Sequence, residues 1–165
     1  MNRRLFLVAF PAALVAGCGF QLRRLDGIPF ASIYVDAPPD SDVAKRIMSA
    51  LKANQSTRLA ASAAEADAVL KLDKEHLSKS ILSLSGAGRV TEYRLGLDMS
   101  YTVSGKNERS LAVPEVIELS RDMTYDDTQL LAKSAEEALL YRDMADNAAR
   151  RIIRRLQSLK PGTGS

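Results

Sequence analysis

The residue with the most distinctive chemistry in this chain is Cys18, which carries the only thiol among 165 residues. It directly follows Val15-Ala16-Gly17, a group of small side chains that ends a short apolar run. Small residues in this position are typical of the end of a signal peptide. If the Cys18 thiol is modified, no cysteine remains for a disulfide, a zinc site or a thiol nucleophile.

The first 17 residues have the parts of a secretory signal peptide. Arg3 and Arg4 give a positive start, and Leu5 to Ala16 form an apolar stretch that is too short to span a bilayer. The end of this segment resembles the lipobox of bacterial lipoproteins, where cleavage leaves an acylated cysteine as the first mature residue. We expect residues 1–17 to be removed and an acyl or diacylglycerol lipid to be attached to Cys18, with no other cofactor. The alternative is a free thiol behind an ordinary signal peptide or a short anchor.

The other reactive side chains offer little for catalysis or metal binding. His76 is the only histidine, and its neighbours Glu75 and Lys79 give no metal-ligand spacing. Asp126-Asp127 lacks the further oxygen ligands of a calcium loop and is better interpreted as a polar connection. The sequence also lacks a Gly-x-Ser-x-Gly elbow, a phosphate loop and a His-Glu-x-x-His helix. We therefore expect no catalytic residue, no metal site and no enzyme activity.

Two basic residues are candidate contacts for an anionic ligand. Arg89 lies beside the glycine-containing turn at residues 85–88, where a side chain can reach outward. Lys133 immediately precedes Ser134, where we expect a helix to begin, next to backbone N–H groups that favour an anion. An ordinary surface charge is the alternative for each. A denser basic cluster consists of Arg150, Arg151, Arg154 and Arg155. Its simplest interpretation is a solvated helix end.

Charge and length predict one globular domain without a nucleic-acid partner. The formal net charge of +3 falls to +1 once the leader is removed with its two arginines. The sequence pI of about 9.1 therefore overstates how basic the mature chain is, and nucleic-acid binding loses its main support. Removal of 17 of the 165 residues leaves 148, which is enough for one core.

Hydrophobic periodicity predicts the elements of this domain. We expect a lipidated tether over 18–29, a single domain over 30–160 and a disordered tail over 161–165. The predicted strands are residues 33–35, a short one near 58–60, 69–84 with a bulge near Leu77, 93–103 and 117–125. The predicted helices are one of about three turns from Ser41 and a long one from the capping box at residues 134–137. Residues 55–67 otherwise have no clear period.

These elements predict an α+β fold in the order β-α-β-β-β-α. Residues 93–103 and 117–125 alternate between apolar and polar side chains, which indicates antiparallel hairpins with one solvated face. Two apolar helix faces and one apolar sheet face must be buried together. We therefore expect two α-helices packed on one face of a mainly antiparallel sheet of about four strands.

The chain resembles the LptE family of lipopolysaccharide-assembly lipoproteins over essentially its whole length. The sharpest motif is Cys18-Gly19-Phe20-Gln21-Leu22-Arg23, which is close to the family's Cys-Gly-aromatic-His-Leu-Arg opening. Gln21 stands where many members carry histidine. Further similar motifs are Thr91-Glu92-Tyr93, Leu131-Ala132-Lys133 and Arg154-Arg155-Leu156. The turn at residues 85–88 departs from other members.

The resemblance implies binding and scaffolding. Members of the family resemble a plug inside the large LptD β-barrel, help to assemble it, and take part in the delivery of lipopolysaccharide to the outer leaflet. It implies LptD as the partner in a heterodimer and lipopolysaccharide as a ligand, with Arg89 and Lys133 as the contacts to test first. It also implies export and an outer-membrane location through Cys18, with which Gly19 agrees. Two alternatives remain open: a structural envelope lipoprotein with another barrel partner, and a periplasmic lipid or cell-wall hydrolase.

Overall fold

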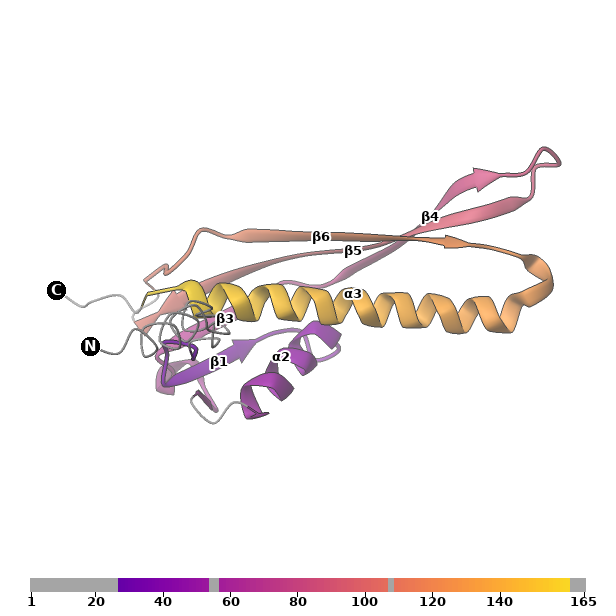
Figure 1. Ribbon diagram of the computed structural model, residues 1–165. Coiled ribbons are helices and arrows are strands. Elements are labelled where there is room, and N and C mark those ends of the chain that lie inside the picture. Colours follow the sequence, from indigo (N-terminus) through magenta and orange to yellow (C-terminus); the bar gives the residue numbers. More distant parts are fainter. Residues whose placement is uncertain (1–26, 54–56, 107–108, 161–165) are drawn as a thin grey trace, which may run out of the picture.

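The structure is a computed structural model, and it describes residues 27–53, 57–106 and 109–160. A long helix runs beside a twisted sheet, and a shorter helix lies near one end (Figure 1). The strands are β1 (Ser32–Asp36), β2 (Arg58–Leu59), β3 (Ala68–Leu72), β4 (His76–Leu84), β5 (Val90–Gly105) and β6 (Glu115–Thr124). The helices are α2 (Asp42–Ala53), α3 (Leu130–Ser158) and the two 3-10 turns η1 (Ala63–Glu65) and η3 (Asp127–Gln129).

Strand β5 is the centre of the sheet, and it confirms the strand predicted from strict alternation. Its end at residues 101–105 pairs with β3, and its beginning at residues 90–98 pairs with β4 along the same edge. Strand β6 pairs with the other edge. One face of β5 is almost fully buried, at 0–4% exposure, through Leu95, Leu97, Met99, Tyr101 and Val103. The predicted hairpins on both sides of β5 are therefore confirmed.

The sheet is larger and more mixed than the sequence predicts. It has six strands among the described residues, and β1 pairs in parallel with both β2 and β3. The α+β class with two α-helices is confirmed, whereas the sheet of about four mainly antiparallel strands and the order β-α-β-β-β-α are wrong. The reason is that parallel pairing joins strands such as residues 32–36 and 68–72, which lie far apart in the chain and carry no turn signal between them.

We call the end of the molecule that holds most of its core the base. It consists of β1, β2, β3, α2, residues 99–105 of β5 and residues 144–158 of α3. Both helices bury one apolar face in a single core cluster with the sheet, and the largest fully buried side chains of the helices are Val43, Ile47, Leu51, Met144, Ile152 and Leu156. The cluster begins at Ile28, so packing starts two residues before the predicted domain boundary.

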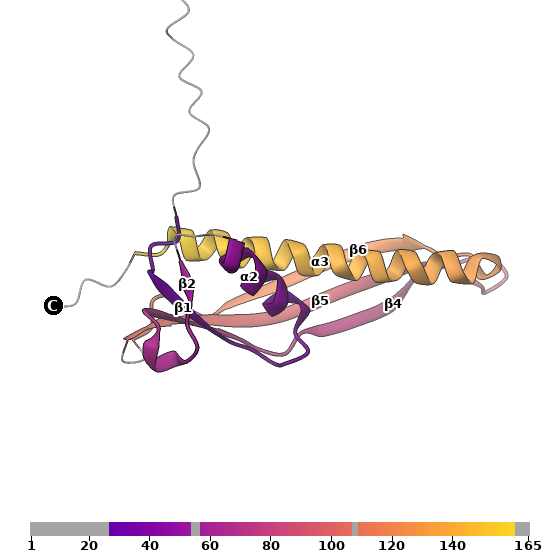
Figure 2. The same ribbon diagram turned by 90° about the horizontal axis from the view of Figure 1, so that it is seen from below.

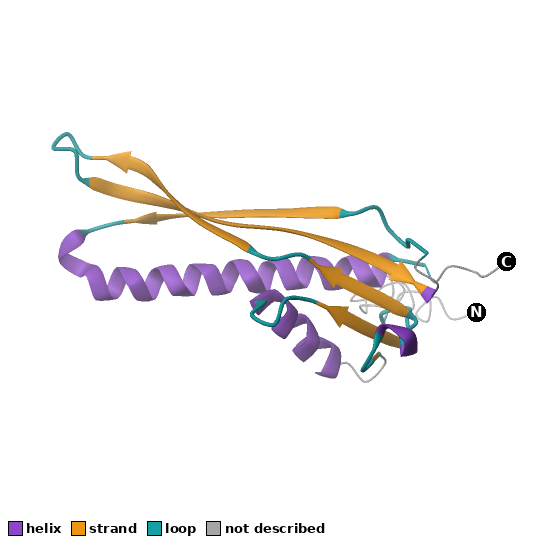
Figure 3. Ribbon diagram, turned by 180° about the vertical axis from the view of Figure 1, so that it is seen from behind, coloured by secondary structure: helices purple, strands orange, loops and turns teal. Residues whose placement is uncertain are grey.

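We call the other end the arm. It consists of β4, residues 90–98 of β5, residues 118–124 of β6 and residues 130–143 of α3. Strands β4 and β5 twist away from the helix toward their connecting turn (Figure 3). The predicted strand 69–84 is divided at residues 73–75, and the register shifts lie between Ile81 and Leu84. The prediction of one strand with a bulge near Leu77 is therefore wrong in both respects, because the chain passes there from the base to the arm.

Helix α3 begins earlier than predicted. Its first residue is Leu130, and Ser134 lies inside the helix, where its hydroxyl donates to the Leu131 carbonyl at 2.9 Å. Glu137 reaches across to Lys79. The capping-box prediction is wrong because both side chains have other partners. The helix is entered instead through η3, which Asp126 caps by accepting hydrogen bonds from the Thr128 N–H and hydroxyl.

Candidate functional site: the arm

A row of apolar side chains on β4 faces the helix side of the sheet but is not covered by a helix. Leu77 lies opposite Leu97 on β5, and Ile81 lies opposite Tyr93. Opposed residues share a face of the sheet. Leu97 is only 1% exposed, whereas Leu77 is 50% and Ile81 58% exposed. The face of the sheet that is buried on β5 is therefore exposed to solvent on β4.

The same change occurs along α3. Its buried residues begin at Met144, and no residue from 130 to 143 is buried. Leu131 and Leu139, in the arm, are 87% and 59% exposed. At 1.5 Å per residue, α2 is about 18 Å long and α3 about 43 Å, so α2 can cover only part of α3. Figure 2 shows α2 below the base half of α3, with the arm half uncovered.

The arm is nevertheless held in a defined position by polar contacts between β4 and α3. The Lys79 ammonium pairs with the Glu137 carboxylate at 2.5 Å and lies 4.4 Å from the centre of the Tyr93 ring. The Tyr141 hydroxyl donates to the Ser78 carbonyl at 2.8 Å. The hydrogen bond to Glu137 raises the pKa of Lys79, so the ion pair stays formed at neutral pH. The exposed apolar row therefore belongs to an ordered surface.

The opposite face of the arm is polar and built from small side chains. Ser78, Gly96 and Ser120 form one row across β4, β5 and β6. They line a shallow depression of about 420 Å³ together with charged neighbours that include Asp98 and Glu118. A Cβ at position 96 would collide with the Ser78 hydroxyl in its present rotamer, so glycine leaves room for this hydroxyl above β5. This face can form hydrogen bonds with a polar partner.

One ion pair crosses that polar face beside the depression. The Arg94 guanidinium binds both oxygens of the Asp122 carboxylate, at 2.7 and 2.9 Å. This contact lowers the pKa of Asp122 and raises that of Arg94. A paired charge can be placed against a polar surface without leaving an unsatisfied group.

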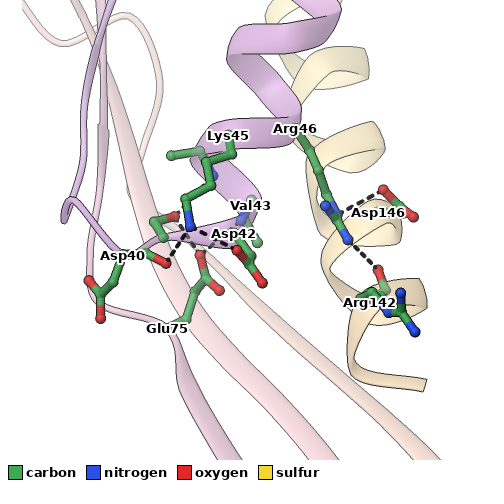
Figure 4. A network of polar contacts seen from close by, with 10 residues as sticks. Asp40, Asp42, Val43, Lys45, Arg46, Glu75, Arg142 and Asp146 are labelled. Atoms are coloured by element: carbon green, nitrogen blue, oxygen red, sulfur yellow. Dashed lines mark hydrogen bonds and ion pairs between the residues drawn. The ribbon is translucent and has the colours of Figure 1, made fainter. Parts of the chain in front are cut away.

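The junction between base and arm is a polar network at the beginning of α2 (Figure 4). The Glu75 carboxylate, one residue before β4, accepts hydrogen bonds from the Ser41 hydroxyl at 2.5 Å and the Val43 N–H at 3.0 Å. The Ser41 hydroxyl in turn accepts from the Ala44 N–H, which confirms the predicted helix start. On the far side of α2, Arg46 pairs with Asp146 of α3 at 2.8 Å. The hydrogen bonds of Glu75 thus fix the position of the chain just before β4, where the arm begins.

Arg89 lies where the sequence predicts, at the turn between β4 and β5. The Ser85 N–H donates to the Arg89 carbonyl at 2.7 Å, and the Arg89 N–H donates to the Ser85 hydroxyl at 3.1 Å. Gly88 has a φ of +74°, a conformation that favours glycine. Arg89 is exposed, and in the described parts of the chain its side chain has no ion pair. Its guanidinium is available to an anionic ligand.

Lys133 has a different environment from the one predicted. It is the fourth residue of α3, and its ammonium pairs with Glu136 at 2.9 Å and donates to the Thr124 hydroxyl at 3.1 Å. Its side chain is only 15% exposed. Figure 1 shows the β4–β5 turn and the beginning of α3 at the same end of the molecule but on diverging elements. The structure therefore does not bring Arg89 and Lys133 into one pocket.

The remaining predicted residues give no second site. Cys18 lies outside the described residues. His76 is exposed at the start of β4, and Asp126, whose pKa is lowered by its hydrogen bonds to Thr128, serves as the η3 cap. Within residues 27–53, 57–106 and 109–160, no group of three or more metal-ligating side chains is suitably placed for a metal ion.

The apolar row of β4 is the surface that sequence reasoning missed. Leu77 and Ile81 lie four positions apart, so β4 lacks the strict alternation of apolar side chains that predicts β5. The one available signal was Lys79, which stands between Leu77 and Ile81 on the same face. A lysine in an apolar row indicates that the row is not fully covered.

Comparison with known proteins decides the family. A family model described as LptE, lipopolysaccharide-assembly, matches residues 30–156. The chain belongs to the LptE family. A relative named LPS-assembly lipoprotein LptE, from Photorhabdus laumondii subsp. laumondii, is 27% identical over 153 residues, which cover 91% of this chain and 82% of the relative. The resemblance expected from the sequence motifs is therefore confirmed.

Solved structures of other lipoproteins have the same fold as this LptE-family chain. The solution structure of an uncharacterized lipoprotein B from Nitrosomonas europaea matches with a TM-score of 0.74 and 30% identity, over 85% of this chain and 91% of that one. The crystal structure of the rare lipoprotein B from Shewanella oneidensis matches with a TM-score of 0.67 and 28% identity, over 77% and 94% of the two chains. None of the described helices of the LptE-family chain is long and apolar enough to cross a membrane.

Proposed function

We propose that this protein is an outer-membrane lipoprotein that plugs the LptD β-barrel, helps to assemble it, and takes part in the delivery of lipopolysaccharide to the outer leaflet. Family membership supports the role in lipopolysaccharide assembly. The observation that carries the partner assignment is the arm, where an ordered frame presents apolar side chains to solvent. Exposed apolar surface of this kind is typical of protein interfaces.

The two faces of the arm fit different parts of a barrel interior. The lumen of an outer-membrane barrel is lined by polar groups, and a plug must satisfy them. The row of Ser78, Gly96 and Ser120, with the paired Arg94 and Asp122 beside it, offers hydroxyls and a neutralised ion pair for this purpose. The apolar row of Leu77 and Ile81 is exposed to water in the protein alone. Its burial against apolar side chains of LptD stabilises the complex.

Lipopolysaccharide carries phosphate groups, and we assign its first contacts to Arg89 and Lys133. Arg89 can pair with a phosphate bidentately, whereas Lys133 contributes a point charge that it already shares with Glu136. We therefore expect Arg89 to contribute more. Arg89→Glu in the purified protein is predicted to weaken lipopolysaccharide binding about five-fold, in line with less than about 1 kcal/mol for one exposed contact. Unchanged binding after reversal of both residues would refute this assignment.

The proposed location depends on a covalent lipid at Cys18. Each buried methylene of an acyl chain contributes about 0.8 kcal/mol of membrane affinity, so several chains hold the protein to the membrane almost permanently. Mass spectrometry of the native protein is expected to show an acylated residue 18 at the amino terminus. An unmodified thiol or an uncut leader contradicts the proposal.

The function proposed here is binding, with no catalytic step. A periplasmic lipid or cell-wall hydrolase is the competing proposal, and it predicts that a single side-chain change abolishes turnover of a lipid or peptidoglycan substrate. A structural lipoprotein with another barrel partner is the second alternative. Purification from membranes with Cys18 intact separates the two scaffold proposals, because the proposed function requires LptD to be recovered at equal stoichiometry.

The arm assignment is tested by two matched pairs of substitutions in the lipidated protein. Ile81→Ser with Leu84→Ser removes apolar surface from the arm, and Val113→Ser with Val116→Ser removes it from the loop before β6 and the start of β6. All four side chains are more than half exposed. The arm pair is expected to lower the recovery of LptD about ten-fold while the control pair leaves it unchanged. Equal recovery with both pairs, at equal thermal stability, means that the arm is not the interface.

A further inference from the structure

Three arginines in the last turns of α3 form no ion pair with another side chain of the described residues. Arg150, Arg151 and Arg154 are all exposed, and no carboxylate of the described residues pairs with them. The neighbouring Arg155 is different, because its guanidinium pairs with Glu115 of β6 at 2.5 Å. In the arm half of the same helix, Lys133 is paired, and the exposed Arg142 donates to the Ala138 carbonyl without an ion pair. Three of the four α3 arginines without an ion pair therefore lie within five positions near its end.

This end of α3 lies where the described chain begins. Ile28 and Phe30 share the core cluster with Leu156 and Leu159. Figure 2 shows the first described residues next to the C-terminal end of α3, away from the arm. The first described residues and the three arginines therefore lie at the same end of the molecule, whereas Leu131 lies about 40 Å along the helix axis from its last residue.

The length of chain between the anchor and the fold limits how far this end can be from the membrane. Nine residue steps separate Cys18 from Gly27. At about 3.5 Å per residue they span at most about 30 Å. Whatever path these residues take, a lipid on Cys18 keeps the beginning of the base within that distance of the headgroups.

We propose that Arg150, Arg151 and Arg154 bind an anionic phospholipid surface, the leaflet that holds the Cys18 lipid. Guanidinium groups pair bidentately with phosphate, and each basic residue close to an anionic membrane adds to its attraction. This contact fixes the orientation of the base at the leaflet that holds the Cys18 lipid. The inference rests on the proposed lipid anchoring and goes beyond it, since acylation by itself specifies no orientation.

The test uses the chain from residue 19 onward without its lipid, because every residue of the core cluster lies between Ile28 and Leu159. Its partition coefficient is measured by sedimentation with vesicles of equimolar phosphatidylcholine and phosphatidylglycerol, and with vesicles of pure phosphatidylcholine. Binding is expected only to the anionic vesicles and is expected to fall with added salt. The triple variant Arg150→Glu, Arg151→Glu, Arg154→Glu is expected to bind them about 100-fold more weakly.

A second triple variant controls for net charge. Lys52→Glu, Arg58→Glu and Lys71→Glu change the charge equally on exposed positions of α2, β2 and β3. Their combined effect is expected to stay within about three-fold, because these side chains lie on other elements of the base than the helix face proposed to meet the phosphates. Equal losses in both variants, or no loss in the first, overturn the inference.

The same experiment separates this inference from the proposed function. The α3 variant is expected to keep its recovery of LptD and its binding of lipopolysaccharide. If it binds anionic vesicles normally but loses LptD, the arginines belong to a protein interface and the inference is wrong while the proposed function stands. If native residue 18 carries no lipid, the proposed anchoring fails whatever the vesicles show.

Discussion

The base and the arm are built from the same strand and the same helix, yet they differ in what covers them. In the base, α2 closes the apolar face between β1 and α3, and Ile33, Ile47 and Ile152 are all 0% exposed. In the arm, α3 covers β5 and β6 but leaves β4 open, and Ile81 is 58% exposed. One sheet thus passes from a closed core to an uncovered surface.

The difference indicates which part of the protein supplies most of the free energy of folding and which part leaves an apolar surface uncovered. Burial in the base supplies the free energy of folding, because apolar area removed from water stabilises the native state. The apolar area of the arm supplies little of that free energy while it is exposed. It becomes stabilising only when another surface covers it, which is the behaviour expected of a binding element.

The largest predicted effect is a core substitution in the base. Ile152→Ala is expected to lower the free energy of unfolding by about 3 kcal/mol, since it leaves a cavity in a fully packed site. Leu131→Ala on the same helix removes a side chain that is 87% exposed and is expected to cost less than about 0.5 kcal/mol. Urea denaturation of both variants measures the contrast. Similar losses would mean that the arm is as closed as the base.

The junction is expected to have the next largest effect. Glu75→Ala removes the acceptor for the Ser41 hydroxyl and the Val43 N–H at the start of α2, which predicts a loss of about 1–2 kcal/mol. Hydrogen exchange is expected to become faster at the start of α2 and along β4. Lys74→Ala, an exposed neighbour, is the control and is expected to be neutral. If exchange rises only in α2, Glu75 does not connect the arm to the base.

A smaller effect, dependent on pH, is predicted within the base at Asp67. Its pKa is lowered by hydrogen bonds from Lys106 and from Ser32, whose N–H and hydroxyl both donate to the carboxylate. A lowered pKa means that the carboxylate contributes stability above its ordinary value of 3.8 and loses it as the pH falls below that value.

Asp67→Asn is therefore expected to cost about 1 kcal/mol at pH 7. Chemical denaturation from pH 7 to pH 2 is expected to show the two proteins converging in acid. A constant difference over this range would show that the charge of Asp67 contributes nothing.

The smallest predicted effect concerns the ion pair between Lys79 and Glu137, which links β4 to α3 in the arm. Lys79→Met and Glu137→Gln break an ion pair whose two side chains are 34% and 26% exposed. A double-mutant cycle is expected to give a coupling energy of about 0.5 kcal/mol, typical of such a pair. A coupling energy near zero would mean that the Tyr141 hydroxyl and the packing of α3 position β4 without help from the ion pair.

Local patterns in the sequence were sufficient for some of the elements. The alternation from Tyr93 to Val103 predicts β5, and Ser41 followed by apolar residues at helical spacing predicts α2. Both signals depend on residues that lie close together in the chain, so the element that each one predicts is also found in the structure. The start of α3 was mispredicted because Ser134 and Glu137 match a capping box, while in the structure Glu137 binds Lys79, 58 positions earlier in the chain.

The uncovered arm could not be predicted in the same way. Leu77 and Ile81 lie on an apolar face of β4 that Lys79 interrupts, and the sequence does not say that α3 covers Leu95 and Leu97 of β5 but leaves β4 open. Periodicity reports which face of a strand is apolar, and tertiary packing decides whether that face is buried. For the site, the position of Arg89 at a turn could be predicted, but the pairing of Lys133 with Glu136 and Thr124 could not.

The central claim is that the base is complete by itself and that the arm is completed by LptD. Hydrogen exchange of the protein alone and in complex with LptD tests it most directly. We predict that amides of β4 and of residues 130–143 gain protection in the complex, while those of β1, α2 and residues 148–156 of α3 are unchanged. Added protection confined to the base, with the arm unaffected, would contradict the account.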